Sequence, residues 1–358
     1  SDYLDFKNGL NPKPDKFGKG IKFISVMDIL NNAIITNDCI RASVDVSEEE
    51  LQNFSVENGD MLFQRSSETL EDVGRANVYM DDKPAVFGGF VIRGKKKAEY
   101  NPLFFRYLLA SPFARKKIIP MGAGAQHFNI GQEGLSKVKL NFASLGEQNK
   151  IAKLMLAIDE RISTQNKIID KLQSLIKGIS NKIFESLQGQ ECRLGDIATI
   201  TNGNSNVQDA VTEYRDDLYP FFDRSEEIKY LPTFLFDKEA IIYPGEGADF
   251  FPRYINGKFA LHQRCYAIFD FNKAVNPQFL YCFLKTQNSY FIRNAVGSTV
   301  PSLRLDTFQK LKVIVPSKKT QSIVSSLLFT LEKKHNSEKM LLQTLLKQKQ
   351  YLLFQMFI

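Results

Sequence analysis

Arginine, amide and hydroxyl side chains stand beside turn-forming residues in both halves of this 358-residue sequence. Arginine can donate two hydrogen bonds to one guanine, an amide can pair with adenine in a similar way, and a serine hydroxyl can bind a phosphate. These residue types in surface loops predict a surface that can contact the grooves of DNA. For each residue alone, a solvated loop, a cap or a turn is the alternative.

The candidate DNA-contacting residues form one group in each half. Those of the first half are Arg65, Ser66, Ser67, Arg75, Gln126, His127 and Asn129. Those of the second half are Asn204, Arg224, Arg253, Gln263, Arg264, Ser298, Thr299 and Arg304. Lysines at Lys13, Lys16, Lys19 and Lys22, and again from Lys95 to Lys97, would attract phosphates without regard to base sequence.

Residues that could catalyse a reaction form no recognisable arrangement. The three histidines, His127, His262 and His335, lack zinc-binding spacing, so we expect no metal site. Neither a P-loop nor a glycine-rich cofactor turn is present. Asn101-Pro-Leu-Phe104 only partly matches the Asn-Pro-Pro-aromatic signature of adenine methylation, because leucine replaces the second proline. No catalytic residue is therefore predicted.

The composition is that of a globular protein with a moderate basic excess. Hydrophobic residues make up 43% of the chain and charged residues 24%, which is enough to bury a core. The 47 lysines and arginines outnumber the 40 acidic residues, and the net charge of +7 tolerates a polyanionic partner. The length predicts two or three domains. Four scattered cysteines and short apolar runs predict a soluble, cytoplasmic protein with no membrane partner.

Two stretches of the sequence repeat one another. Residues 124–144 and 297–317 both run from a glycine through a polar loop into an alternating, strand-like segment. The shift between them is 173 positions, and the same shift carries Gln148 to Gln321. The chain therefore contains one structural unit twice, and each copy must be placed before any site is interpreted.

Weaker matches extend the repeat upstream. Asn101-Pro-Leu-Phe104 corresponds to Asn276-Pro-Gln-Phe279 with a shift of 175 positions. Both predict a helix with an asparagine cap and proline at its first position. Tyr79–Lys83 and Tyr254–Lys258 share that shift and predict a hairpin in each half.

A long amphipathic helix is predicted at the end of each half. Apolar residues at steps of three and four run through residues 147–184 and again through 320–357, the pattern of a heptad seam. The seam positions include Leu154, Ile158, Ile162, Ile169, Leu172 and Ile176 in the first helix, and Ile323, Leu327, Leu331, Leu342, Leu345 and Leu352 in the second. Core packing is the alternative for one such helix, but two of equal length favour an antiparallel coiled coil.

Polar residues interrupt both seams. Gln165 and Glu338 occupy the same repeat position. They either specify the register of the two helices at some cost in stability, or lie in solvent.

The whole arrangement resembles the specificity subunit of a type I restriction–modification system. The resemblance is carried by residues 148–184, which begin Gln-Asn-Lys-Ile-Ala and end Asn-Lys-Ile-Phe, and by their return at residues 345–357. Gly59-Asp-Met-Leu-Phe63 and Leu194-Gly-Asp-Ile-Ala198 add to it. As an arrangement of two domains and two long helices, the resemblance covers essentially the whole chain.

The resemblance implies a fold and a role. The fold is mixed α/β, with two target recognition domains, about residues 1–146 and 187–318, separated by an antiparallel coiled coil of helices at about 147–186 and 319–358. The chain would be a non-catalytic subunit in which each domain reads one half of a bipartite, asymmetric target in double-stranded DNA. The helices would set the spacing between the two half-sites.

Partners also follow from the resemblance. The helices would dock two modification subunits, which are methyltransferases that bind S-adenosylmethionine and methylate adenine. Restriction subunits that join them would give a nuclease dependent on ATP and magnesium. No cofactor is then expected on this chain. One departure is that the first half has no counterpart of Cys192–Thr201, so we expect its first domain to be either N-terminally trimmed or unusual.

Two other classes of function stay open. One is a coiled-coil scaffold whose globular ends bind proteins, and weak salt dependence of any DNA affinity would favour it. The other is a stand-alone enzyme, a methyltransferase or a nuclease. Binding of S-adenosylmethionine by the chain without partners would favour the enzyme.

Overall fold

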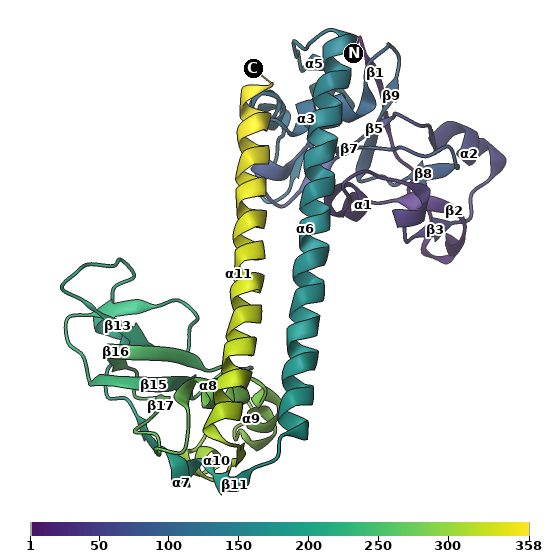
Figure 1. Cartoon of the computed structure of the whole chain (residues 1–358). Helices are drawn as coiled ribbons and strands as arrows, with labels where there is room; N and C mark the ends of the chain where they lie inside the picture. Colours follow the sequence, from purple (N-terminus) through teal and green to yellow (C-terminus); the bar gives the residue numbers. More distant parts are fainter. Residues whose placement is uncertain (1, 358) are drawn as a thin grey trace. The chain divides into compact units, whose positions relative to one another are not determined.

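The structure, a computed structural model, describes residues 2–357 and divides into two compact units (Figure 1). Unit 1 consists of the chain up to Lys167 together with the chain from Met340 onward, and unit 2 is Ile168–Lys339. Each unit thus contains one globular part and a segment of each of two long helices. The internal repeat expected from the sequence is present in the fold.

The globular part of unit 1 is built on two small sheets. Its elements are β1 (Leu4–Asn8), β2 (Phe17–Ile24), α1 (Val26–Asn31), β3 (Ser43–Val44), α2 (Glu48–Phe54), β4 (Ser55–Val56), β5 (Met61–Gln64), β6 (Ser66–Ser67), β7 (Ala76–Val78), β8 (Ala85–Phe87), β9 (Val91–Lys96), α3 (Pro102–Ala110), α4 (Pro112–Ile118), β10 (Phe128–Asn129) and α5 (Gln132–Lys137). One sheet has the order β1-β9-β5-β7, and the other has the order β3-β2-β8-β4.

Strand β5 is apolar throughout its first three residues because both of its faces are covered. Met61 and Phe63 belong to the core that contains Leu108 of α3, whereas Leu62 belongs to a second core with Ile24 and Phe87. Successive side chains of a strand point to opposite faces, so a continuous apolar run is what two cores require.

The globular part of unit 2 has one larger sheet. Its elements are β11 (Gln190–Arg193), α7 (Leu194–Ile197), β12 (Thr199–Asn202), β13 (Tyr219–Phe222), β14 (Lys229–Leu231), β15 (Phe236–Pro244), β16 (Arg253–Leu261), β17 (Cys265–Phe269), α8 (Pro277–Lys285), α9 (Asn288–Asn294), α10 (Leu305–Gln309) and β18 (Lys312–Val315). The main sheet has the order β12-β17-β15-β16-β13-β14, and β11 pairs with β18.

Strand registers show how the two units correspond. Asn8 of β1 lies opposite Ile92 of β9, and Asn202 of β12 lies opposite Tyr266 of β17. The order β1-β9-β5-β7 of unit 1 therefore recurs as β12-β17-β15-β16 in unit 2. From Ile92 to Tyr266, at the start of β9 and β17, the shift is 174 positions.

The two hairpins expected from the sequence are wrong. Residues 79–83 join β7 to β8, which lie in different sheets. Residues 254–258 lie inside β16, which pairs with β15 from Arg253 to Phe259. The weak sequence match thus pairs a connecting loop of unit 1 with a strand of unit 2.

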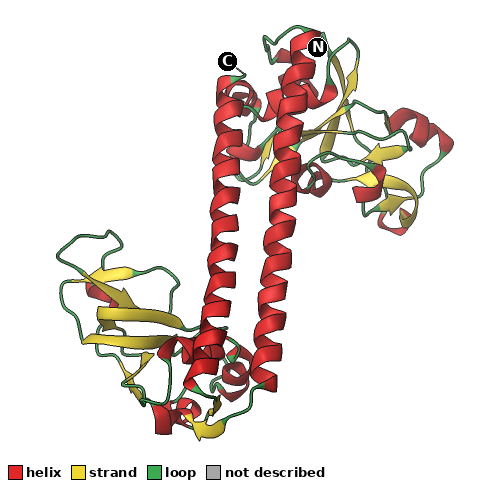
Figure 2. Ribbon diagram, viewed as in Figure 1, coloured by secondary structure: helices red, strands yellow, loops and turns green. Residues whose placement is uncertain are grey.

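The two long helices pack against one another within each unit. They are α6 (Leu145–Ser186) and α11 (Lys318–Gln355), and Figure 2 shows them in red. In unit 1, Ile158 and Ile162 near the start of α6 share a core with Leu352 near the end of α11. In unit 2, Ile183 near the end of α6 shares a core with Leu328 near the start of α11. The pairing is therefore antiparallel, as the sequence predicted.

Most predicted seam positions are in the interface. Ile158, Ile169 and Leu345 are buried, and Ile162, Leu172, Ile176, Leu331, Leu342 and Leu352 are half-buried. Three positions expected in the seam are wrong, because Leu154 and Leu327 are each 44% exposed and Ile323 is 59% exposed.

A shift of one residue explains these exposed positions. Met155, rather than Leu154, packs into the core of unit 1, and Val324 and Leu328 pack with Phe279 of α8 in unit 2. At these ends each helix also contacts its own globular part, which draws a different face of the helix inward.

The polar residues of the seam are not solvated. Gln165 is 6% exposed, and the side chain of Glu338 is 12% exposed and forms an ion pair with Lys334 one turn earlier. Lys349 of α11 pairs with Asp159 of α6 at 2.5 Å. The seam therefore buries polar groups together with their partners, as low solvent access demands.

A buried glutamine ties the start of each long helix to its globular part. The Oε1 atom of Gln148 accepts a hydrogen bond of 2.9 Å from the Asn101 N–H, and that of Gln321 accepts one of 2.6 Å from the Asn276 N–H. Both asparagines also cap their own helices, α3 and α8, as the sequence predicted. The repeat thus extends to individual hydrogen bonds.

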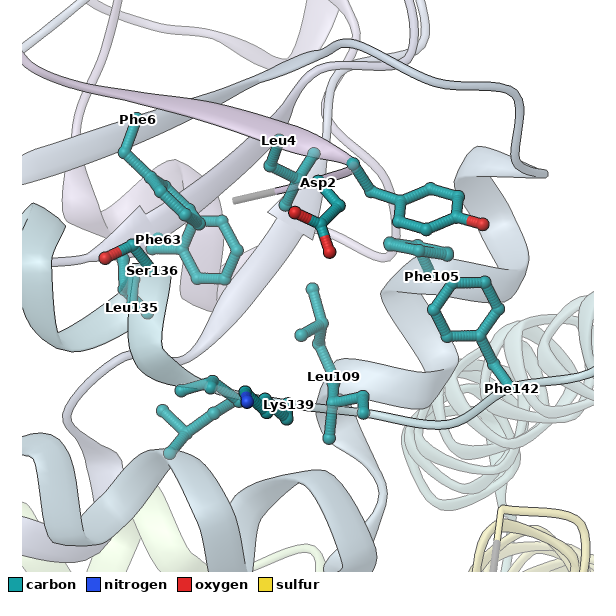
Figure 3. A pocket seen from close by; sticks show the side chains of 14 residues that line it. Asp2, Leu4, Phe6, Phe63, Phe105, Leu109, Leu135, Ser136, Lys139 and Phe142 are labelled. Carbon is teal, nitrogen blue, oxygen red and sulfur yellow. The ribbon is translucent and has the colours of Figure 1, made fainter.

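The units differ beneath the main sheet. Unit 1 has a cavity of about 430 Å³ lined by β1, β5, α3 and α5, with Phe63, Phe105 and Leu109 on its walls (Figure 3). In unit 2, Leu194 and Ile197 of α7 are buried in the corresponding core.

Candidate nucleic-acid interface

A tight turn between β16 and β17 presents two candidate residues of unit 2. The Cys265 N–H donates to the His262 carbonyl at 2.9 Å, which leaves Gln263 and Arg264 at the two central, exposed positions. The Gln263 N–H donates to the Ser205 carbonyl at 3.2 Å. The loop that carries the candidate Asn204 is thus fixed against this turn.

A second loop of unit 2 closes on itself. Val296 and Ser302 exchange two backbone hydrogen bonds of 2.8 Å, and the Leu303 N–H donates to the Gly245 carbonyl at 2.7 Å. Ser298 and Thr299 are exposed between these ends. Arg304 is exposed immediately before α10 and does not line the polar cavity of unit 2.

A polar cavity of about 560 Å³ adjoins the turn of unit 2. The polar and charged residues that line it are Asp223, Arg224, Ser225, Lys229, Glu246, His262, Gln263 and Arg264. Arg264 pairs with Glu246 at 2.7 Å, and Lys229 pairs with Asp223 at 2.6 Å. The cavity therefore offers hydrogen-bond donors and acceptors side by side, the chemistry that reads base edges.

His262 contributes a neutral donor to this cavity. Burial lowers the pKa of His262 below its usual value, so the ring is uncharged at neutral pH. Its Nδ1 atom accepts from the Arg264 N–H at 3.3 Å, which assigns the remaining proton to Nε2. Sequence analysis missed His262, Asp223, Lys229 and Glu246, because only the folded sheet brings them together.

Arg253 supports the cavity rather than lining it. Its guanidinium donates to the Ser225 carbonyl at 2.9 Å and also to the Asp223 carbonyl. Burial lowers the pKa of this arginine. Arg253 therefore holds the Asp223–Ser225 segment in place.

The candidates of unit 1 gather around a similar pair of loops. Asn129 of β10 pairs with Ser66 of β6, and their side chains also share a hydrogen bond. Gln126 and His127 are exposed in the loop before this pair. Ser67 is buried and its hydroxyl accepts from the Thr69 N–H at 3.2 Å. Ser67 is therefore a structural residue of the loop.

The two arginines predicted in unit 1 have different surroundings. The Arg65 Nη1 atom donates to the Gly89 carbonyl at 3.2 Å, so the guanidinium lies over the turn between β8 and β9. Arg75 is exposed and pairs with Asp72 at 2.6 Å. Only Arg65 lies directly beside this turn. Phe90 in the same turn is 67% exposed, and sequence analysis missed it.

The loops of the two units share a backbone frame. The Ile130 N–H donates to the Arg65 carbonyl at 2.9 Å, as Leu303 does to Gly245. Ala123 and Asn129 exchange backbone hydrogen bonds of 2.9 and 2.8 Å, as Val296 and Ser302 do. Ala123, Asn129 and Ile130 each stand 173 positions before their counterparts, whereas Arg65 stands 180 positions before Gly245. The candidate surfaces are thus equivalent in position and different in side chain.

Within residues 2–357, no three or more histidine, cysteine, aspartate or glutamate side chains are grouped so that they could hold a metal ion. Across that same range, no helix has the length and apolar character needed to span a membrane.

One family model matches both copies of the repeated unit. The model of the type I restriction modification DNA specificity domain matches residues 2–174 and matches again at residues 189–347. The chain belongs to this family.

Individual members of the specificity domain family agree with the assignment. The EcoDI type I restriction enzyme specificity subunit of Escherichia coli is 30% identical over 138 residues, which are 38% of this chain and 30% of that protein. The matched segment thus spans less than a third of that relative's length. The EcoKI specificity subunit of E. coli K12 is 22% identical over 181 residues, 49% of this chain and 38% of that protein.

A solved structure shares the fold. The type I restriction–modification S subunit from M. genitalium covers 99% of this chain and 94% of its own, with a TM-score of 0.63 and 18% identity. The two-domain fold with long helices is therefore that of specificity domain proteins.

Proposed function

We propose that this chain is the DNA-recognition subunit of a type I restriction–modification system. Residues 1–146 and 187–318 are the two recognition domains, and each reads one half of a bipartite, asymmetric target. The chain itself carries no catalytic step. Adenine methylation, with S-adenosylmethionine, and any ATP- and magnesium-dependent cleavage belong to partner subunits.

One observation carries this proposal: the two units present unlike side chains on one backbone frame. Arg65 and Gly245 accept equivalent hydrogen bonds from Ile130 and Leu303. A pair of domains with equal side chains would read a palindrome. Different side chains in equal positions support an asymmetric target instead.

Charge on the surface supports association with DNA. Lys13 and Lys19 are exposed in unit 1, and Arg224 and Arg264 are exposed beside the cavity of unit 2. Cations that neutralise phosphates make affinity fall steeply with salt concentration. The proposal therefore requires binding that depends both on salt and on base sequence.

Selection from a random duplex library tests the proposal. The full chain should enrich two short conserved blocks separated by a fixed number of unread base pairs. Arg264→Ala should relax the base preference of one block only, by about tenfold for a lost bidentate contact. Equal loss on every sequence would identify Arg264 as a phosphate contact, and enrichment of no sequence would contradict the proposed function.

The exposed apolar positions of the long helices support docking of two modification subunits. Leu154 in unit 1 and Leu327 in unit 2 are separated by the repeat shift of 173 and are each 44% exposed. Equal patches in two units suit two copies of one partner. In this proposal the length of the helices sets the number of unread base pairs.

Variants of these two leucines test the partner proposal. With a co-expressed type I modification subunit, the unchanged chain should bind two copies, Leu154→Asp or Leu327→Asp one copy, and the double variant none. Glu160→Ala and Lys333→Ala are matched exposed controls on the same helices. Mass from light scattering gives the stoichiometry, and two copies bound to the double variant would contradict the proposed docking surface.

A further inference from the structure

Corresponding turns in the two units present different side chains. The turn Gly88–Val91 is closed by a hydrogen bond of 2.8 Å from the Val91 N–H to the Gly88 carbonyl, and the turn His262–Cys265 by the equivalent bond of 2.9 Å. The first residue of each turn also donates to a neighbouring strand. These bonds are Gly88 to Ile24 at 3.0 Å and His262 to Phe222 at 2.9 Å. Phe90 of unit 1 therefore occupies the position of Arg264 in unit 2.

Neighbouring positions show the same change from charged to apolar. The residues that follow Ile24 and Phe222 correspond, so Val26 stands in place of Arg224 and Met27 in place of Ser225. Met27 is 60% exposed, whereas Arg224 and Ser225 line the polar cavity of unit 2. The frame is thus shared, but unit 1 presents apolar groups where unit 2 presents donors and acceptors.

The turn that carries Phe90 is held firmly. The Arg65 N–H donates to the Phe90 carbonyl at 2.9 Å. The two preceding glycines are closely packed, because a Cβ atom at Gly89 would lie 2.0 Å from the Asn11 side chain and one at Gly88 would lie 2.6 Å from the Phe23 ring. The backbone is packed on its inner side, so the exposed phenyl ring extends from a rigid support.

A single exposed phenylalanine is common on protein surfaces and needs no explanation by itself. The position of Phe90 is what distinguishes it, since its counterpart Arg264 borders the cavity that offers base-reading groups. In the major groove, the 5-methyl group of thymine is the one apolar feature among the base edges. A phenyl ring cannot hydrogen-bond to base edges but can pack against that methyl group.

We propose that Phe90 reads a thymine by contact with its 5-methyl group, and that unit 1 selects an A·T pair at that position of its half-site. Arg264 in unit 2 selects its base by hydrogen bonds. Arg65, whose guanidinium lies beside Gly89, supplies the polar contact that accompanies Phe90. This inference rests on the proposed function and specifies the chemistry of one half-site.

Replacement of thymine by deoxyuridine tests the inference. The selected duplex is rebuilt with uracil at one thymine position at a time, and binding of the full chain is measured by titration. One position, in the block whose preference depends on Phe90, should lose about fourfold in affinity, the value expected for one buried methyl group. With Phe90→Ala, thymine and uracil at that position should bind equally.

Two further variants complete the test. Phe90→Leu should keep part of the preference for thymine, because leucine can still contact the methyl group. Arg264→Ala should leave the thymine–uracil difference unchanged while it alters the other block. Circular dichroism should show that Phe90→Ala folds normally, since this ring is exposed.

The outcomes separate the inference from the function on which it rests. A bipartite motif with no thymine–uracil difference in the Phe90-dependent block would overturn the inference and leave the proposed function intact. Equal weakening of all sequences by Phe90→Ala would also overturn it. If the chain selects no sequence at all, the proposed function itself fails.

Discussion

Units 1 and 2 agree in their backbone frame and differ in two places, the candidate DNA surface and the space beneath the main sheet. The capping asparagines and buried glutamines are the same in both units. At the surface, Phe90 faces the surroundings where unit 2 has Arg264. Beneath the main sheet, unit 1 has a cavity of about 430 Å³, and the core of unit 2 contains Leu194 and Ile197 of α7. The hydrogen bonds that tie the long helices to the globular parts are shared by the two units, whereas the side chains of the candidate surface differ.

Removal of a side chain from α7 should give the largest difference between the units. Leu194 is completely buried in the core of unit 2. Leu194→Ala should lower the free energy of unfolding of unit 2 by about 3 kcal/mol, because it leaves a cavity in that core. Urea unfolding followed by circular dichroism measures the change. Leu194→Met is the volume-matched control and should cost less than about 1.5 kcal/mol.

Replacement of each buried glutamine should lower the free energy of unfolding by an amount that follows the number of hydrogen bonds it makes. Gln321 accepts from the Asn276 N–H and donates to the Ala274 and Pro316 carbonyls, both at 2.8 Å. Gln148 accepts from one N–H and donates to one carbonyl. Gln321→Ala should therefore cost about 2–3 kcal/mol and Gln148→Ala about 1–2 kcal/mol, by the cost of unpaired buried groups.

Urea unfolding of each glutamine variant measures these costs. Gln343→Ala, at an exposed position of α11, is the control and should be nearly neutral. Equal costs for Gln148 and Gln321 would show that the extra bond of Gln321 contributes nothing.

Replacement of the capping asparagines should lower the stability of the two units by nearly equal amounts. The Asn101 Oδ1 atom accepts from the Phe104 N–H at 2.9 Å, and that of Asn276 accepts from the Gln278 N–H at 2.9 Å. Asn101→Ala and Asn276→Ala should each cost about 1 kcal/mol. Thermal unfolding would contradict the equivalence of the units if one variant were neutral and the other not.

Acidic pH should lower the stability of unit 2 through a titratable side chain that unit 1 lacks at the equivalent position. His335 in the seam stands 173 positions after Ile162, and burial, together with Lys339, lowers the pKa of His335. Glu332 and Lys285 are also nearby and act in opposite directions. A histidine with a lowered folded pKa binds its proton more readily when unfolded, so stability falls as pH drops below about 6.5.

The variant His335→Ile, which copies unit 1, should reduce this loss. The difference in urea midpoint between pH 7.5 and 5.5 should be smaller for His335→Ile than for the unchanged chain. His127→Asn, in an exposed loop, is the control and should leave the difference as it is. If the difference in urea midpoint were the same in His335→Ile as in the unchanged chain, protonation of other groups would account for the loss of stability in acid.

The helices and their caps could be predicted because their signals are local. The seam from Ile158 to Ile176 follows from steps of three and four residues, and the caps at Asn101 and Asn276 follow from the asparagine–proline pair. The predictions for Leu154 and Leu327 were wrong because of tertiary contacts. At that end of each helix, the globular part packs against a different face of the helix.

The candidate surface could be predicted only in part. Gln263, Arg264 and Arg224 meet at one cavity, as their residue types suggested. Glu246 and His262 follow separate strands, β15 and β16, and no spacing in the sequence shows that they meet. Phe90 was missed because the correspondence with Arg264 rests on hydrogen bonds of the turn, and the two residues share neither type nor flanking sequence.

The frame shared by both surfaces consists of main-chain hydrogen bonds, such as Ile130 to Arg65 and Leu303 to Gly245. Main-chain groups are the same for every amino acid. A mutation at the tip can therefore replace one base preference by another while the fold stays as stable as before. New specificity in such a protein can evolve one residue at a time, with no compensating change elsewhere.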